Sequence, residues 1–237
     1  MILDRLRYEF RLMGNIVLLT PPLLFLGFAL FAALLSVIGI TSPGFLSAGL
    51  EMFLPVAMGL VMATVCIQDP ALELQLTMPY SFANTVLSRM LLIIAWSACT
   101  AIGASALLAV LHLSVQPQQA QTMPLFARLL VEQLTWFAPL LWFVSIGTCT
   151  TLLTHSRTAS AALLSSIWLV ETLFFKPLVA SNAWLQPLFL FPTTLAPTVP
   201  YWLTTRVEVL VTALLLLPLS WLLLRNTEGL LKGSHHE

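Results

Sequence analysis

Six long apolar runs dominate this 237-residue sequence. A helix needs about 20 mostly apolar residues to cross the hydrocarbon core of a bilayer. Runs that reach or approach this length cover residues 16–40, 45–67, 86–115, 125–153, 158–175 and 201–224. An outer-membrane barrel would instead show segments of about ten residues with alternating polarity. The sequence therefore predicts an all-α integral membrane protein: a single transmembrane domain over residues 1–237, with six transmembrane helices.

The charge content supports the same class of protein. Hydrophobic residues make up 59% of the chain and charged residues only 8%, whereas soluble domains carry about 25% charged residues. Ten basic residues balance ten acidic ones, so the formal net charge is +0. Because no basic field is present to attract phosphate backbones, nucleic acid is excluded as a partner. This composition predicts that the lipid bilayer surrounds the protein.

The distribution of basic residues predicts the orientation. An even number of spans returns the C-terminus to the side of the N-terminus. If that side is cytoplasmic, seven of the ten basic residues face the cytoplasm and three face outward, namely Arg128, Lys176 and Arg206. This asymmetry agrees with the positive-inside rule. We expect both termini of this multi-pass protein to be cytoplasmic.

The first 14 residues form a candidate element of their own. Apolar side chains recur at helical spacing there, and most of the charged ones fall on the other side. This pattern is typical of a short amphipathic helix that lies in the membrane interface. The alternative is a basic tail that orients the first span and has no fold.

Residues 176–200, between the fifth and sixth spans, combine prolines with an apolar run. Five prolines interrupt the segment, and residues 184–191 read WLQPLFLF. Irregular backbone at membrane depth is tolerated only where protein or a wet cavity satisfies it. We expect short re-entrant helices that dip into the outer leaflet and close the path, with Trp184 and Phe189 among the outer gate residues. An exposed hydrophobic loop is the alternative.

Charges at membrane depth are the next candidates for a site, because each is costly unless paired or hydrated. Glu171 is expected to be the deepest carboxylate, with Lys176 or Arg206 as its partner. We interpret it first as part of a structural ion pair, and alternatively as a polar gate or substrate contact. Arg128 and Glu132 are four residues apart and could also pair.

Sequence patterns of catalysis are missing. The chain contains no HExxH and no GxSxG motif, and its two glycines at 39 and 44 are followed by Phe45-Leu46 where a phosphate loop requires Lys and Ser or Thr. Cys66, Cys99 and Cys149 lie in apolar runs without CxxC spacing, which favours buried inert thiols. We therefore expect no enzymatic activity and no cofactor bound by this chain.

One segment carries a family resemblance. Residues 68–81 read QDPALELQLTMPYS and are followed by FANTVLSR up to residue 89. The Leu72-Glu73 pair and the Thr77–Ser81 run, which lie between the second and third spans, and Leu87-Ser88-Arg89, which opens the third, resemble the signature of type-two ABC exporter permeases. Pro70 and Ala71 stand where that family has Gly-Thr.

This resemblance implies a fold and a mechanism. The family has an N-terminal interface helix, six spans and re-entrant helices between spans five and six. Two permeases, identical or homologous, enclose a path, and separate ATPase subunits bind and hydrolyse ATP. In a bacterial cytoplasmic (inner) membrane, residues 68–85 would then be the coupling segment. Its expected ATPase contacts are Leu72, Glu73, Leu76, Met78 and Pro79, with His155 and Arg157 in a second inner loop.

A different class of protein remains as the alternative. A gradient-driven secondary transporter or channel-like protein would place carboxylates or broken helices near the midplane, often in inverted repeats. No convincing repeat relates residues 1–118 to residues 119–237. An ordinary amphipathic loop with no partner is the corresponding alternative for residues 68–85.

Overall fold

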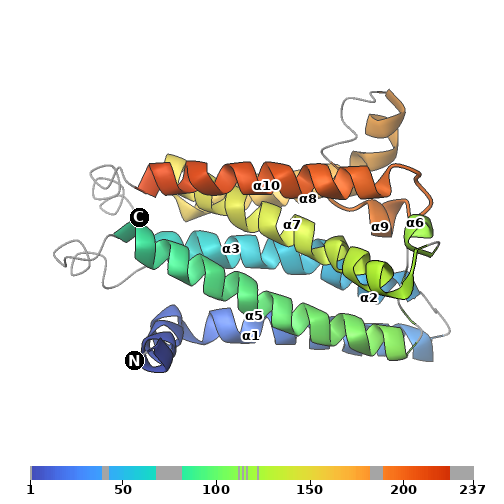
Figure 1. Ribbon diagram of the computed structural model, residues 1–237, viewed down its shortest axis with the longest axis horizontal. Coiled ribbons are helices and arrows are strands. Elements are labelled where there is room, and N and C mark those ends of the chain that lie inside the picture. The colour runs from blue at the N-terminus through green and yellow to red at the C-terminus, as the bar shows by residue number, and fades with distance from the viewer. Residues whose placement is uncertain are drawn as a thin grey trace.

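A computed structural model describes residues 2–38, 43–67, 82–111, 113, 115, 117–121, 123–181 and 189–224. Side chains are described for residues 14–38, 44–66, 84–111, 113, 115, 117–121, 123–174 and 189–224. The described chain is helical without a strand, and its long helices run side by side in an elongated bundle (Figure 1). The all-α prediction is confirmed.

The first helix, α1, spans Ile2–Val37 and is broken at Gly14, whose φ of 75° and ψ of 172° are not helical. A positive φ is accessible to glycine at little cost. The break falls at the boundary that the sequence suggests for an N-terminal element, and in Figure 1 the first turns of α1 lie at an angle to the rest of the helix. Attachment of these turns to a membrane surface stays a prediction.

The second apolar run is one continuous helical path with a wider turn inside it. It begins with α2 (Pro43–Ala48), continues through the π-helical turn η1 (Gly49–Phe53) and ends with α3 (Leu54–Ile67). The N–H of Leu54 donates to the carbonyl of Gly49, five residues earlier. Such turns accommodate one extra residue and are frequent at functional sites.

The described residues in the middle of the chain form α5 (Phe82–Val110), α6 (Gln118–Gln121), α7 (Leu125–Thr154) and α8 (Arg157–Ser181). The last two are α9 (Pro192–Leu195) and α10 (Trp202–Leu224). Helix α7 is central and packs against α3, α8 and α10, whereas α1 packs chiefly against α3 and α5.

Two glycines allow α3 and α7 to approach closely. A Cβ at Gly59 would lie 2.9 Å from the carbonyl oxygen of Phe143, and a Cβ at Gly147 would lie 2.9 Å from that of Gly59. In a membrane no hydrophobic force drives helices together, so association depends on close packing. Small residues at a helix crossing allow the backbones to approach closely enough for that packing. The core of the bundle is built on this crossing.

The long helices alternate in direction, so α1 begins and α10 ends at the same end of the bundle (Figure 1). We call this the terminal end. The end of α3, the start of α5 and the turn between α7 and α8 also lie there. The opposite end, here called the distal end, carries α2, α6 and α9.

Five described segments are long and apolar enough to cross a membrane: Gly14–Val37, Gly44–Cys66, Asn84–Val110, Leu125–Thr154 and Trp202–Leu224. They correspond to five of the six predicted spans. The remaining one, residues 158–175, lies within α8, which is a helix but not one of these five. The protein has the helices of a multi-pass membrane protein, and a sixth span stays a prediction.

Candidate functional site

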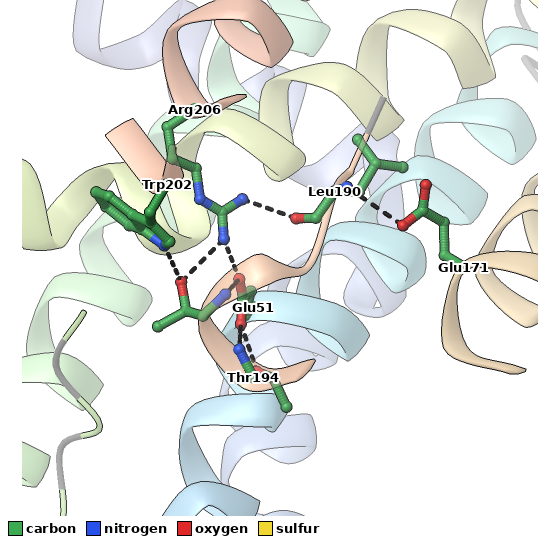
Figure 2. A network of polar contacts seen from close by, with 7 residues as sticks. Glu51, Glu171, Leu190, Thr194, Trp202 and Arg206 are labelled. Carbon is green, nitrogen blue, oxygen red and sulfur yellow. Dashed lines mark hydrogen bonds and ion pairs between the residues drawn. The ribbon is translucent and has the colours of Figure 1, made fainter. Parts of the chain in front are cut away.

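The most concentrated polar chemistry inside the bundle surrounds Glu51, at the distal end. Glu51 lies in η1, and its side chain is 0% exposed. Arg206, near the start of α10, is also 0% exposed and forms an ion pair with it through Nη2 and Oε1. Figure 2 shows the two side chains meeting between η1 and the segment that carries α9.

Backbone groups complete the coordination of the carboxylate. Thr193 N donates to Glu51 Oε1 at 2.9 Å, and Thr194 N donates to Oε2 at 2.6 Å. The hydroxyl of Thr194 donates to Oε2 as well. Both threonines belong to α9, so these bonds come from the first turn of a helix, where N–H groups have no intrahelical acceptor. Glu51 thereby fixes α9 to the second helical path.

The guanidinium of Arg206 is bound on several sides. Its Nη1 donates to the carbonyl of Leu190 at 2.7 Å, and its Nη2 donates to Thr193 Oγ1 at 3.1 Å. The Trp202 Nε1 donates to that same hydroxyl oxygen at 2.8 Å, and Arg206 Cζ lies 5.5 Å from the centroid of the Trp202 ring. Only Nε of Arg206 lacks a hydrogen-bond partner.

Glu171 joins this network through a peptide group and not through an ion pair. Leu190 N donates to Glu171 Oε2 at 3.3 Å, while the carbonyl of the same residue accepts from Arg206 (Figure 2). The structure brings Glu171 and Arg206 to one site, but the acid bound directly to Arg206 is Glu51. The side chain of Lys176, the other expected partner, is outside the described residues.

The expectation that Glu171 is the deepest carboxylate in the membrane stays a prediction, but Glu171 is not the acid most buried within the protein. Glu51 is completely buried, whereas Glu171 is only partly so. Sequence reasoning missed Glu51 because one acid in an otherwise apolar run gives no local pattern, and its partner is 155 positions away. A usable signal did exist: Glu51 and Arg206 both follow the start of their runs by a few residues, and in six alternating spans the second and sixth run in the same direction, which puts the two residues at similar depth.

The segment expected to form re-entrant helices is described in part. Helix α8 extends to Ser181 and α9 is a single turn, so short re-entrant helices stay a prediction. Phe189, Leu190 and Phe191 are buried, and the rings of Phe191 and Phe143 stack with centroids 6.0 Å apart. The alternative of an exposed loop is therefore wrong for these three residues. Trp184 lies outside the described residues.

Helix α6 closes over the same end. Gln118 N donates to the carbonyl of Pro197 at 3.3 Å, and Gln119 accepts from Leu203 N at 3.0 Å. The side-chain amide of Gln119 also donates to the Pro200 carbonyl. The segments before α7 and before α10 thus hold each other beside the ion pair.

Of the expected ATPase contacts, His155 and Arg157 are among the described residues. Leu72, Glu73, Leu76, Met78 and Pro79 fall in residues 68–81, outside the described residues. At the terminal end, His155 ends α7 in a left-handed conformation with φ 51°, and exposed Arg157 begins α8. Their contact with a partner stays a prediction.

Two smaller expectations have clear outcomes. Arg128 Nε lies 3.0 Å from Glu132 Oε1, so this pair is formed. Cys66 and Cys149 are buried as expected, but Cys99 is exposed.

The network is suited to holding the structure together. Glu51 accepts hydrogen bonds from three residues, and no group of three His, Cys, Asp or Glu side chains among the described residues is arranged to hold a metal ion. Removing one partner of a buried pair leaves a charge without compensation and costs about 3–5 kcal/mol. The site is therefore a lock that joins η1, α9 and α10.

Comparisons of the chain with protein-family models, with curated proteins and with solved structures gave no match. The function is accordingly argued from the sequence pattern and from the geometry described above.

Proposed function

We propose that this chain is the transmembrane permease subunit of an ABC exporter. In this proposal it forms a substrate path with a second permease, and separate ATPase subunits drive transport. The observation that carries the proposal is the Leu72–Ser81 pattern between the second and third long apolar segments, followed by Arg89 near the start of the third. This chain would itself bind no cofactor, and ATP would be bound by the partner.

The arrangement of the terminal end supports the proposal. Helix α3 ends at Ile67 and α5 begins at Phe82, and the turn from α7 to α8 at His155 and Ser156 lies at the same end (Figure 1). An ATPase bound beneath this end would meet both the 68–81 segment and Arg157. With six spans, the fifth in α8, both termini and this end would be cytoplasmic in a bacterial inner membrane.

The distal end would then face outward and act as the outer gate. The Glu51–Arg206 lock ties α9 to the bundle, and Glu171 binds the Leu190 backbone just before it. In the proposed cycle residues 176–200 form the outer plug. Release of cargo requires this segment to move away from η1.

A gradient-driven transporter is a weaker explanation of the same buried charges. Such a protein needs a midplane carboxylate with room for a proton or cation. Arg206 is only four residues from the start of α10, roughly 6 Å along its axis, and both oxygens of Glu51 already accept hydrogen bonds. The pair is thus near one end and occupied by protein donors.

Purification from native membranes tests the proposal. We expect a phosphate-loop ATPase to copurify with the chain, and Glu73→Lys to weaken that association. Truncating one member of a buried intersubunit charge pair costs about 2–5 kcal/mol, and 1.4 kcal/mol corresponds to about tenfold in affinity. Copurified ATPase should fall sharply while the amount of permease stays constant.

Glu208→Lys is the matched control, because it makes the same charge change near the distal end of α10. It should leave the amount of copurified ATPase unchanged. Full retention of the ATPase by Glu73→Lys would contradict the docking role of this segment. Native complexes that contain no ATPase subunit would contradict the exporter assignment itself.

A further inference from the structure

A cavity of about 280 Å³ lies at the distal end between α5 and α7, and neither Glu51 nor Arg206 lines it. Ser47 of α2 and Leu50 of η1 contribute to its wall, and Ala106 and Ala109 line the α5 side. An apolar cavity of about 150 Å³ suffices for benzene, whereas whole-ligand pockets measure about 300–1,000 Å³. The volume therefore fits one hydrocarbon chain segment or ring of a larger molecule.

Most polar groups of the cavity lie on its α7 wall, with Ser105 on α5 and Ser47 on α2. Gln133 Oε1 accepts from Trp136 Nε1 at 2.9 Å and from Ser105 Oγ at 3.5 Å. The Trp136 N–H is thereby used within the protein. Glu132, whose Oε1 pairs with Arg128, and Thr135 also line the α7 wall, so carboxylate and hydroxyl oxygens are present there as acceptors. A ligand polar group that donates a hydrogen bond complements this wall.

The depth of the cavity matches the boundary between lipid headgroups and acyl chains. Ala109 is one residue from the end of α5, and Gln133 is eight residues from the start of α7, about 12 Å along its axis. Ile102 and Leu129, which also line the cavity, are 52% and 51% exposed. These apolar side chains stand where bilayer lipid would surround α5 and α7.

We propose that this cavity binds one hydrocarbon chain of a membrane amphiphile whose polar end carries a hydroxyl group. The chain occupies the apolar wall formed by Leu50, Ala106 and Ala109, and the hydroxyl donates to the oxygens on the α7 wall. This site does not depend on the exporter role, because it follows from the volume, lining and depth of the cavity alone.

Photolabelling of the full-length protein in lipid vesicles tests the proposal. Two probes carry a diazirine in a hydrocarbon chain: a long-chain primary alcohol and a diacyl phospholipid. The labelled peptides are mapped by mass spectrometry. We expect label on α5 and α7 near the cavity, and a roughly tenfold loss in Ala106→Leu, which fills it; that loss corresponds to about 1.4 kcal/mol of binding.

Ala33→Leu is the matched control, since Ala33 is exposed on α1 and does not line the cavity. It should label as the unmodified chain does. Ala109→Leu provides a second filling variant if Ala106→Leu does not fold. Cavity label from the alcohol alone identifies a free single-chain amphiphile, and label from both probes identifies a bilayer lipid chain.

The methyl ether of the same alcohol tests the hydroxyl separately, since it keeps the chain and removes the donor. It should label the cavity less than the alcohol does. Equal labelling by ether and alcohol would overturn the role of the hydroxyl. Labelling that is the same in Ala106→Leu, Ala109→Leu and Ala33→Leu would overturn the site.

Discussion

Helix α1 and the α2–η1–α3 path are both apolar and long enough to span a membrane, yet they have different surroundings. In the Gly44–Cys66 segment 67% of the most apolar window is buried inside the protein, against 11% in Gly14–Val37. The buried path carries Glu51 and the close-packed Gly59, whereas a Cβ added at Gly27 on α1 would have no neighbouring atom within 4 Å. Apolarity therefore predicts that a helix can span a membrane, whereas its small and charged residues determine which other helices it packs against.

The largest expected effect tests the charge on the buried path. Glu51→Gln leaves Arg206 buried without its counter-charge, which should lower the free energy of unfolding in detergent by about 3–5 kcal/mol. Glu132→Gln removes the acid of the partly exposed Arg128 pair and should cost about 0–1 kcal/mol. Denaturant titration of both variants gives the comparison.

A double variant sharpens this test. Replacing a buried ion pair by apolar residues of similar size is often neutral or stabilising, so Glu51→Leu with Arg206→Met should regain much of the lost stability. If the double variant is no more stable than Glu51→Gln, the threonine contacts of the carboxylate dominate over its pairing with Arg206.

The intermediate effect tests the helix crossing. Gly59→Ala forces a methyl group against the Phe143 carbonyl of α7, and overpacking of this kind costs about 1–3 kcal/mol. Gly27→Ala makes the same change in open space on α1, where higher helix propensity favours the variant slightly. Equal unfolding midpoints for the two variants would show that α3 and α7 can separate without cost.

The smallest effect tests the exposed side. Leu30 on α1 is 64% exposed, so Leu30→Ala should change the free energy of unfolding by less than about 0.5 kcal/mol, as at other surface positions. Leu140 on α7 is 0% exposed, and Leu140→Ala should cost about 2–5 kcal/mol. A large loss in Leu30→Ala would indicate that α1 is covered in the purified protein, for instance by a second copy of the chain.

The sequence allowed most long helices to be located, because length and apolarity are local properties. The predicted run 125–153 corresponds to Leu125–Thr154, and 201–224 corresponds to Trp202–Leu224. The run 86–115 extends too far, since α5 ends at Val110. Leu113 N donates to the Leu108 carbonyl there. In the sequence, an apolar residue in such a turn cannot be distinguished from an apolar residue in a helix, so the predicted run continued past the helix end.

The site was less accessible to sequence reasoning, because it is made by tertiary contacts. Arg206 was expected to bind an acid, but the choice between Glu171 and Glu51 depends on how α8, α9 and η1 pack. The threonine N–H groups that bind Glu51 become donors only because α9 begins at Pro192. No periodic pattern of side chains encodes the direction of those backbone groups.

The wide turn η1 has a consequence for the phase of the second helical path. One extra residue in a turn rotates everything before it by about 100° relative to an uninterrupted α-helix. A stripe of buried positions drawn from Leu54–Ile67 and extended backward is thus shifted by about one residue on passing η1, and both Leu46 and Ser47 of α2 are buried. A scan of single substitutions along Pro43–Ile67 should show two periodic patterns of sensitivity that are out of register, with the discontinuity at Gly49–Phe53.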